Sequence, residues 1–214
     1  MSVQSWREVP VGGALRRDVR EAKRSAILRA AVEVFAERGF ENARMRDVAE
    51  RAGVADGTLY LYFKGKEALL VAALEEHARA FLSRARRDAG RQRDPAAKLR
   101  KVVERHLISL ERDRALAHVF QIELRHSRRF LRQVARGQVA EYLRLLQKII
   151  GEGVAAGQFR ADIPTDVAAR AVFGAVDELV TSWVLAERPR SLAVQAAPLL
   201  RLLFGGLEQR HGGE

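Results

Sequence analysis

Hydroxyl-bearing, aromatic and basic side chains gather in one short segment of the chain, residues 44–66. Hydroxyl groups can bond phosphates and base edges, flat apolar side chains can meet thymine methyls, and lysine or arginine can neutralise phosphate charge. This combination favours non-covalent recognition of double-stranded DNA. The candidate contact residues are Arg44, Arg46, Gly57, Thr58, Tyr60, Leu61, Tyr62, Lys64 and Lys66.

The sequence lacks the residue patterns of the common catalytic sites. It has no HExxH zinc helix, phosphate-loop glycine pattern or GxSxG elbow, and it contains no cysteine. Its five histidines lack metal-ligand spacing, so His77 and His106 are interpreted as core or pocket-wall residues. We therefore expect no enzyme activity, no metal site and no cofactor.

The spacing of apolar residues in segment 44–66 predicts two short helices joined by a tight turn. Gly53 can adopt the positive φ that ends the first helix, and Asp56 can cap the second. The core-facing positions are Met45, Val48, Ala49 and Ala52 in the first helix and Leu59 and Phe63 in the second. This is the pattern of a helix-turn-helix; the alternative is a tight helical corner whose tyrosines pack inward.

A third helix is predicted upstream, from about Arg20 to Arg38, and Gly39 ends it. Residues 20–66 therefore form a three-helix DNA-binding domain. Residues 1–19 contain Pro10 and a Gly-Gly pair and are predicted to be a flexible basic arm. Its arginines either contact a neighbouring groove of the DNA or remain solvated.

The rest of the chain, residues 67–214, predicts a larger all-α domain for ligand binding and dimerisation. Apolar periodicity gives six more helices, with a start signal at Asp94-Pro95 and a break at Pro189, so the whole chain should contain about nine. No segment reaches the ~20 apolar residues of a membrane span. We expect no membrane contact, and the absence of cysteine fits a reducing cytoplasm.

The last two helices are unusually apolar, and a helix that is apolar all round must be covered all round. A second copy of the chain is the predicted cover, forming a two-fold interface. The alternative is a buried central helix within a monomer. The predicted interface residues are Val172, Phe173, Val176, Val180 and Trp183.

Charge is concentrated outside the DNA-binding segment. The chain carries a net charge of +11, and residues 82–132 hold fifteen basic side chains against six acidic ones. Clustered arginines suit phosphate-rich ligands, and an acyl-CoA joins such a head to an apolar tail. The alternative is an arginine-rich solvated surface. The candidate ligand-binding residues are Phe81, His106, Leu107, Leu110, Phe120, Leu124, Arg125, Arg128, Arg129 and Phe130.

Residues 23–70, and above all the run GVADGTLYLYFKGKEALL, resemble the DNA-binding domain of TetR-family transcriptional regulators. The resemblance implies that Leu59 and Phe63 lie in the core. It also implies that segment 44–66 faces a palindromic operator, with two copies of the chain reading two half-sites.

Residues 116–186, with LAHVFQIELRHS, GEGVAAGQFRADI and AVFGAVDELVTSWVL, resemble the FadR branch of that family. The resemblance implies a repressor of fatty-acid degradation genes that leaves DNA on binding long-chain acyl-CoA. It assigns no individual CoA contact. Two alternatives stay open: a TetR-type repressor for another lipophilic ligand, such as an efflux-pump substrate, and a ligand-free architectural DNA-binding protein.

Overall fold

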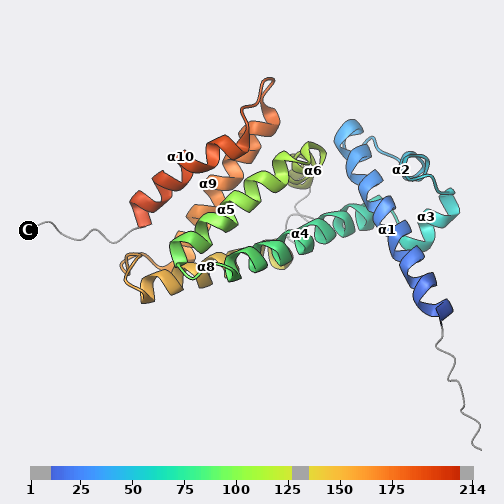
Figure 1. Ribbon diagram of the computed structural model, residues 1–214. Helices are drawn as coiled ribbons and strands as arrows, with labels where there is room; N and C mark the ends of the chain where they lie inside the picture. The colour runs from blue at the N-terminus through green and yellow to red at the C-terminus, as the bar shows by residue number, and fades with distance from the viewer. Residues whose placement is uncertain (1–10, 127–134, 208–214) are drawn as a thin grey trace, which may run out of the picture.

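The computed structural model describes residues 11–126 and 135–207, and in these residues it contains nine α-helices and no strand (Figure 1). The all-α prediction and the predicted number of helices are confirmed. The helices are α1 (Val11–Arg38), α2 (Met45–Ala52), α3 (Asp56–Tyr62), α4 (Lys66–Gly90), α5 (Pro95–Glu111), α6 (Arg114–Gln121), α8 (Ala140–Ala155), α9 (Thr165–Leu185) and α10 (Leu192–Leu207). A 3₁₀ turn, η1 (Glu123–His126), follows α6, and a π-helical turn, η2 (Ala135–Val139), precedes α8.

The helices form two bodies that share one long helix. Helices α1–α3 lie at one end of the molecule, and α4 runs from them along the larger bundle of α5, α6, α8, α9 and α10 (Figure 1). Helix α4 packs against α1 and also against α5 and α8. None of the described helices is long and apolar enough to cross a membrane.

The first helix begins earlier than the sequence analysis predicts. It starts at Val11, so residues 11–19 continue α1, and the prediction that they belong to a flexible arm is wrong. The physical reason is that alanine, leucine, arginine and glutamate follow the Gly-Gly pair, and these residues strongly favour helix. The remainder of the predicted arm, residues 1–10, lies outside the described part of the chain.

Helix ends follow the predicted signals in most places. Gly39 and Gly53 adopt φ values of 74° and 67°, which end α1 and α2 as expected. At the start of α5, the Asp94 side chain accepts a hydrogen bond from the Ala97 N–H at 2.7 Å, with Pro95 at the first helical position.

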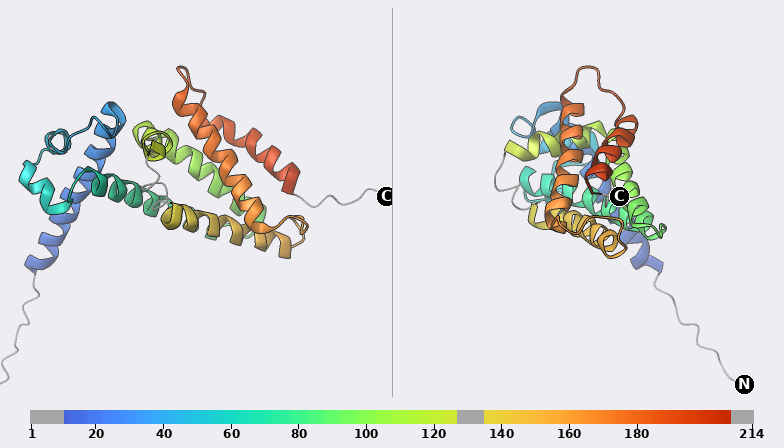
Figure 2. Two further views of the ribbon diagram at one scale, coloured as in Figure 1. Left: turned by 180° about the vertical axis from the view of Figure 1, so that it is seen from behind. Right: turned by 90° about the vertical axis from the view of Figure 1, so that its left-hand side faces the viewer.

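Four of the five residues predicted for the dimer interface are buried inside one chain, and Phe173 is half-buried. Val176 and Val180 have no exposed surface, Val172 is 1% exposed and Trp183 is 8% exposed. Their helix, α9, packs against α5, α6, α8 and α10, and Figure 2 shows α10 running beside it. Phe173 turns inward to meet Tyr142 of α8, with ring centroids 5.9 Å apart. The prediction is wrong for Val172, Val176, Val180 and Trp183, because neighbouring helices already cover them, and for Phe173 it stays a prediction.

One turn beyond α8 depends on a glycine in a crowded place. Gly157 has a φ of 70°, and the chain then folds back so that the Phe159 N–H donates to the Gly153 carbonyl at 3.1 Å. A β-carbon added at Gly153 would lie 2.2 Å from the Phe159 ring. That ring is 2% exposed and stacks on Phe204, so it has no space into which to move.

We therefore expect Gly153→Ala to lower the free energy of unfolding by about 1–3 kcal/mol through overpacking. Gly151→Ala is the matched control, because an added β-carbon there meets nothing within 4 Å. This control should stabilise the helix by up to about 1 kcal/mol. Urea unfolding followed by circular dichroism measures both, and equal stability of the two variants would contradict the packing argument.

Candidate DNA-binding surface and effector-domain interior

Helices α2 and α3 form the predicted helix-turn-helix. Val48, Ala49 and Leu59 have no exposed surface and Phe63 is 6% exposed, so the predicted faces are buried; α2 packs on α1, and α3 packs on α2. The turn is closed by the Val54 N–H, which donates to the Ala49 carbonyl at 3.0 Å. The expected cap is wrong in one detail: Ala55 occupies the N-cap, and Asp56 is the first helical residue without a side-chain cap bond. There its charge still favours the positive end of the helix dipole.

The outer face of α3 is apolar, aromatic and exposed. Tyr60 and Leu61 are 56% and 81% exposed, a large fraction for such side chains in a short helix. Gly57 is exposed too, and a β-carbon there would meet nothing within 4 Å, so nothing in the chain itself blocks close approach of a partner. Thr58 and Tyr62 are half-buried. The alternative in which the tyrosines pack inward therefore does not hold for Tyr60.

The basic residues of segment 44–66 differ in exposure and in whether they already have a hydrogen-bond partner. Arg44, at the N-cap of α2, and Lys64 are exposed. Arg46 is also exposed, but its Nε donates to Glu50 Oε1 at 2.9 Å, one turn along α2. An exposed pair of this kind contributes little stability, so a phosphate can replace Glu50 at small cost.

Lys66 is predicted to contact DNA, but its side chain binds the protein's own backbone. Its ammonium donates to the carbonyls of Phe40 and Glu41, both at 2.9 Å, and lies 4.7 Å from the centre of the Phe40 ring. Lys66 thus ties the start of α4 to the loop between α1 and α2. This is a structural contact that sequence spacing alone does not reveal.

The larger domain holds a cluster of four aromatic side chains, of which Tyr142 is buried and Phe81, His106 and Phe173 are half-buried. Phe81 lies 5.3 Å from both His106 and Tyr142, and Tyr142 meets Phe173 edge-on. The Tyr142 hydroxyl lies 3.2 Å from His106 Nδ1. The structure thus brings together two predicted ligand-binding residues, Phe81 and His106. Tyr142 was missed, although it belongs to the apolar stripe of α8.

Burial sets the charge states in this cluster. It lowers the pKa of His106 to about 4, although the nearby Asp177 carboxylate opposes the shift. Burial also raises the pKa of the Tyr142 hydroxyl. Both groups are therefore neutral at pH 7, so the cluster is an apolar environment with two hydrogen-bonding groups.

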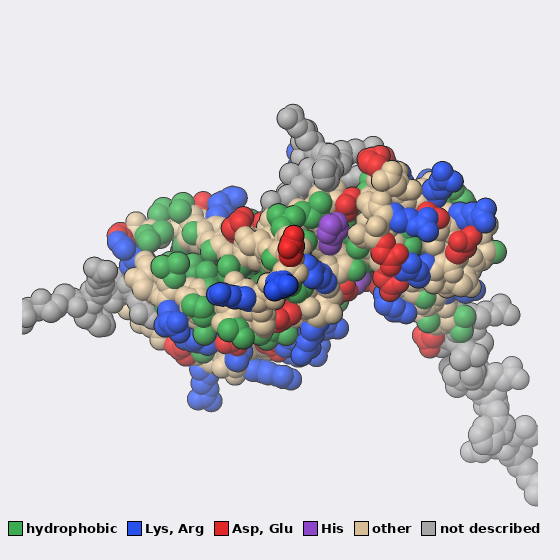
Figure 3. All heavy atoms as spheres, turned by 90° about the horizontal axis from the view of Figure 1, so that it is seen from above, with side chains coloured by type: hydrophobic (Ala, Val, Ile, Leu, Met, Phe, Trp, Pro, Cys, Tyr) green, Lys and Arg blue, Asp and Glu red, His purple; other side chains and the backbone are tan. Residues whose placement is uncertain are grey.

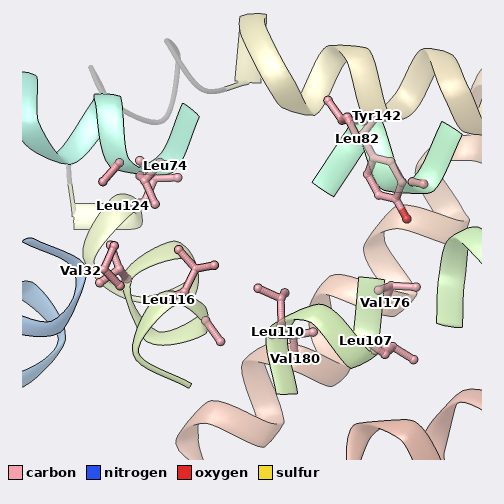
Figure 4. Packing of buried hydrophobic residues seen from close by; sticks show 14 of the residues in the cluster. Val32, Leu74, Leu82, Leu107, Leu110, Leu116, Leu124, Tyr142, Val176 and Val180 are labelled. Carbon is pink, nitrogen blue, oxygen red and sulfur yellow. The ribbon is translucent and has the colours of Figure 1, made fainter. Parts of the chain in front are cut away.

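The predicted apolar lining separates into two groups. Figure 4 shows Leu107 and Leu110 of α5 near Val176 and Val180 of α9. Leu124 lies instead beside Leu74, where α6 and η1 meet α4 and α1. Leu107 and Leu124 are buried, and Phe120 is half-buried. The structure does not bring Leu124 together with Leu107 and Leu110 as one wall.

A buried polar network links α6 to α9. The Gln121 amide donates to Asp177 Oδ1 at 2.8 Å, and the Thr181 hydroxyl donates to Gln121 Oε1 at 3.0 Å. Gln121 is 4% exposed. Sequence reasoning missed this network, because Gln121 gives no signal until α6 and α9 are packed together.

Many of the basic residues in segment 82–132 have partners. Ion pairs join Arg86 to Glu141, Lys98 to Glu152, Lys101 to Glu104 and Arg105 to Asp88. Arg114 instead donates to the carbonyls of Val184 and Ala186 at the end of α9. Within segment 82–132, the exposed arginines that make no ion pair with another described residue are Arg84, Arg87, Arg91, Arg93, Arg100, Arg112 and Arg114, and Arg100 lies over the Phe204 ring. Four of the fifteen basic residues are thus ion-paired within the described chain, which favours the solvated alternative for those four.

Four predicted ligand contacts cannot be placed. The side chain of Arg125 and the residues Arg128, Arg129 and Phe130 lie outside the described part of the structure. Within that part, no group of three or more His, Cys, Asp or Glu side chains is arranged to hold a metal ion.

Two family profiles match the chain in succession. Residues 27–73 match the bacterial regulatory proteins of the tetR family, and residues 74–206 match the C-terminal region of YsiA-like proteins. The fatty acid metabolism regulator protein of Bacillus subtilis is 36% identical over 184 residues, which cover 86% of this chain and 95% of that protein.

Solved structures show the same likeness through both domains. The fatty acid degradation regulator FadR of Bacillus halodurans is 38% identical, covering 88% of this chain and 97% of its own, with a TM-score of 0.83. FadR of Bacillus subtilis in complex with stearoyl-CoA is 37% identical, covering 85% of this chain and 97% of its own, with a TM-score of 0.80.

Neighbouring residues of α3 allow a test of the DNA-binding surface. Tyr60→Ala should weaken binding to a palindromic duplex while thermal unfolding hardly changes, because the side chain is exposed. Leu59→Ala should lower the free energy of unfolding by about 2–5 kcal/mol, because Leu59 is fully buried. Fluorescence anisotropy and calorimetry measure the two effects, and similar destabilisation by both substitutions would assign Tyr60 to the core.

Proposed function

The chain belongs to the TetR family of bacterial regulatory proteins, and we propose that it is a repressor of fatty-acid degradation genes that long-chain acyl-CoA releases from DNA. The observation that carries this proposal is the likeness, through both domains, to FadR of Bacillus subtilis in complex with stearoyl-CoA. As a DNA-binding regulator it acts in the cytoplasm, where the bacterial chromosome lies.

The DNA-binding half of the proposal rests on α3. Tyr60, Leu61 and Gly57 are exposed on α3, and two exposed basic residues are near in sequence, Arg44 at the start of α2 and Lys64 just after α3. Such a helix fits the major groove, where aromatic and apolar side chains meet base edges and basic ones meet phosphates.

The effector half rests on the interior of the larger domain. Phe81, Phe173 and the leucines of α5 supply apolar surface for an acyl chain. His106 and Tyr142 stay neutral there, so they can hydrogen-bond the thioester without an uncompensated buried charge. The phosphates of CoA then meet arginines of segment 82–132 that make no ion pair within the described chain.

Palindromic recognition requires two copies of the chain, and the structure leaves a face for the second. The outward side of α9 carries Val167, Gly174 and Leu185, and that of α10 carries Val194 and Leu202, all exposed. Figure 3 shows apolar side chains gathered on the surface of the larger domain in the view from above. A homodimer through α9 and α10 covers this surface and presents two copies of α3 to two half-sites.

Release of DNA follows if the effector favours one spacing of the two copies of α3 over another. Helix α4 joins the DNA-binding domain to the effector interior, since it starts at Lys66 and carries Phe81. A small rotation of α4 therefore changes the spacing at the operator.

The proposed effector is tested by titrating operator-bound protein with dodecanoyl-CoA, acetyl-CoA and free dodecanoate. The operator is a palindromic duplex selected by the protein from a random pool, and a mobility shift measures release. Each buried methylene contributes about 0.8 kcal/mol, so dodecanoyl-CoA should release DNA at far lower concentration than acetyl-CoA. Dodecanoate should also be weak because it lacks the polyanionic head. Equal effects of the three compounds, or no effect, would refute the acyl-CoA assignment.

The proposed dimer face is tested by one exposed and one buried residue. Leu202→Glu, at a side chain that is 75% exposed, should convert the dimer to a folded monomer that binds the palindrome weakly. Val180→Glu should instead unfold the protein, because it buries an unpaired charge. Sedimentation velocity and circular dichroism separate the two results. A Leu202→Glu variant that remains dimeric at micromolar concentration would exclude Leu202 from the interface.

A further inference from the structure

The loop between α1 and α2 is held from two sides. On one side Lys66, at the start of α4, binds the carbonyls of Phe40 and Glu41. On the other side the Phe40 N–H donates to Glu123 Oε2 at 2.7 Å, across 83 residues of sequence. The DNA-binding domain is therefore bonded directly to η1 of the effector domain.

The Glu123 carboxylate fits closely against this loop. Gly39 turns with a φ of 74°, and the nearest atoms to a β-carbon added there would be the two Glu123 oxygens, at 3.8 and 3.9 Å. Phe40 is 8% exposed and packs on Phe35. The Glu123 side chain itself is 12% exposed, with His118 Nε2 at 3.5 Å. An ionised acceptor in such a sheltered place makes a stronger hydrogen bond than one in open water.

Glu123 also lies close in sequence to residues that contact the interior of the larger domain. Two residues earlier, Gln121 is bonded to Asp177 and Thr181 of α9, and Asp177 lies near enough to influence His106. One residue later, Leu124 is buried beside Leu74 of α4 (Figure 4). Because α6 packs on both α1 and α9, a movement of α6 relative to α1 displaces Glu123 relative to Phe40.

We propose that Glu123 is a positioning residue that couples effector occupancy to the DNA-binding domain. Its bond to the Phe40 N–H holds the loop before α2, and with it α3, in the arrangement that binds the operator. Effector binding shifts α6 and η1 and breaks this bond. The inference rests on the proposed function for the identity of the effector, but not for the contribution of Glu123 to operator affinity.

Operator affinity is measured by fluorescence anisotropy, with and without saturating dodecanoyl-CoA. Without effector, Glu123→Ala should bind the selected palindrome about tenfold more weakly than wild type, the factor expected for loss of a hydrogen bond to a charged group. With effector, the variant and wild type should bind equally, because the bond is already broken. Glu123→Gln keeps an acceptor oxygen and should recover part of the lost affinity, because a neutral acceptor makes a weaker bond than an ionised one.

A matched control and a local probe separate coupling from general destabilisation. Glu141→Ala removes another carboxylate of the effector domain, which pairs with Arg86, and should leave both affinities at the wild-type values. Hydrogen exchange at the Phe40 amide should be faster in Glu123→Ala, and in wild type with dodecanoyl-CoA, while exchange of the core amides of α9 stays slow.

The outcomes distinguish this inference from the proposed function. Wild-type affinity of effector-free Glu123→Ala, or an equal loss of affinity with and without effector, would overturn the coupling role. If wild type does not respond to dodecanoyl-CoA, the acyl-CoA assignment and the effector-driven release of this bond both fall. A tenfold loss in effector-free Glu123→Ala, partly reversed by glutamine, would then still support Glu123 as a positioning residue for DNA binding.

Discussion

Helix α4 must bury apolar surface in two cores at once, and the rest of the structure depends on this constraint. Leu69, Leu70 and Leu74 are fully buried near its start, where it packs on α1, and Leu82 and Ala85 are buried further along, among the effector helices. A continuous helix is stiff, because each turn is hydrogen-bonded to the next. The two domains therefore cannot change their relative position without repacking one end of α4.

A shared helix can transmit movement between the domains, but it does not by itself determine how large that movement is. The contacts on the loop between α1 and α2 supply that second restraint, since Lys66 belongs to α4 and Glu123 to the effector domain. The DNA-binding domain is thus held at two points, one at the start of α4 and one on η1. Under the proposed coupling, a ligand that moves α6 changes the Glu123 contact, and a rotation of α4 moves the Lys66 contact.

Helix α9 shows how one helix can serve both the core and the surface. Its inward side, with Val172, Val176 and Val180, is covered by neighbouring helices of the same chain. Its outward side carries small and apolar residues, including Ala171 and Gly174, which allow another helix to approach closely. Most of the apolar residues of α9 belong to the core of the chain. A smaller exposed stripe remains that a partner could cover.

The sequence by itself determined the all-α architecture, the helix-turn-helix and most helix ends. These depend on local periodicity and on residues such as Gly39, Gly53 and Pro95, whose preferences act within a few neighbours. It also identified Leu59 as core and Tyr60 as an outward residue, because one helix turn suffices to separate the two faces.

Only the tertiary structure decided which partners those helices meet. Three features depend on segments that are far apart in sequence. They are the buried side of α9, the hydrogen bonds from Lys66 to backbone carbonyls, and the contact between His106 and Tyr142. The bond from Phe40 to Glu123 is the clearest case, since neither residue carries a local signal for the other. Periodicity shows which side of a helix is apolar, but packing determines whether that side meets its own chain, a ligand or a second copy.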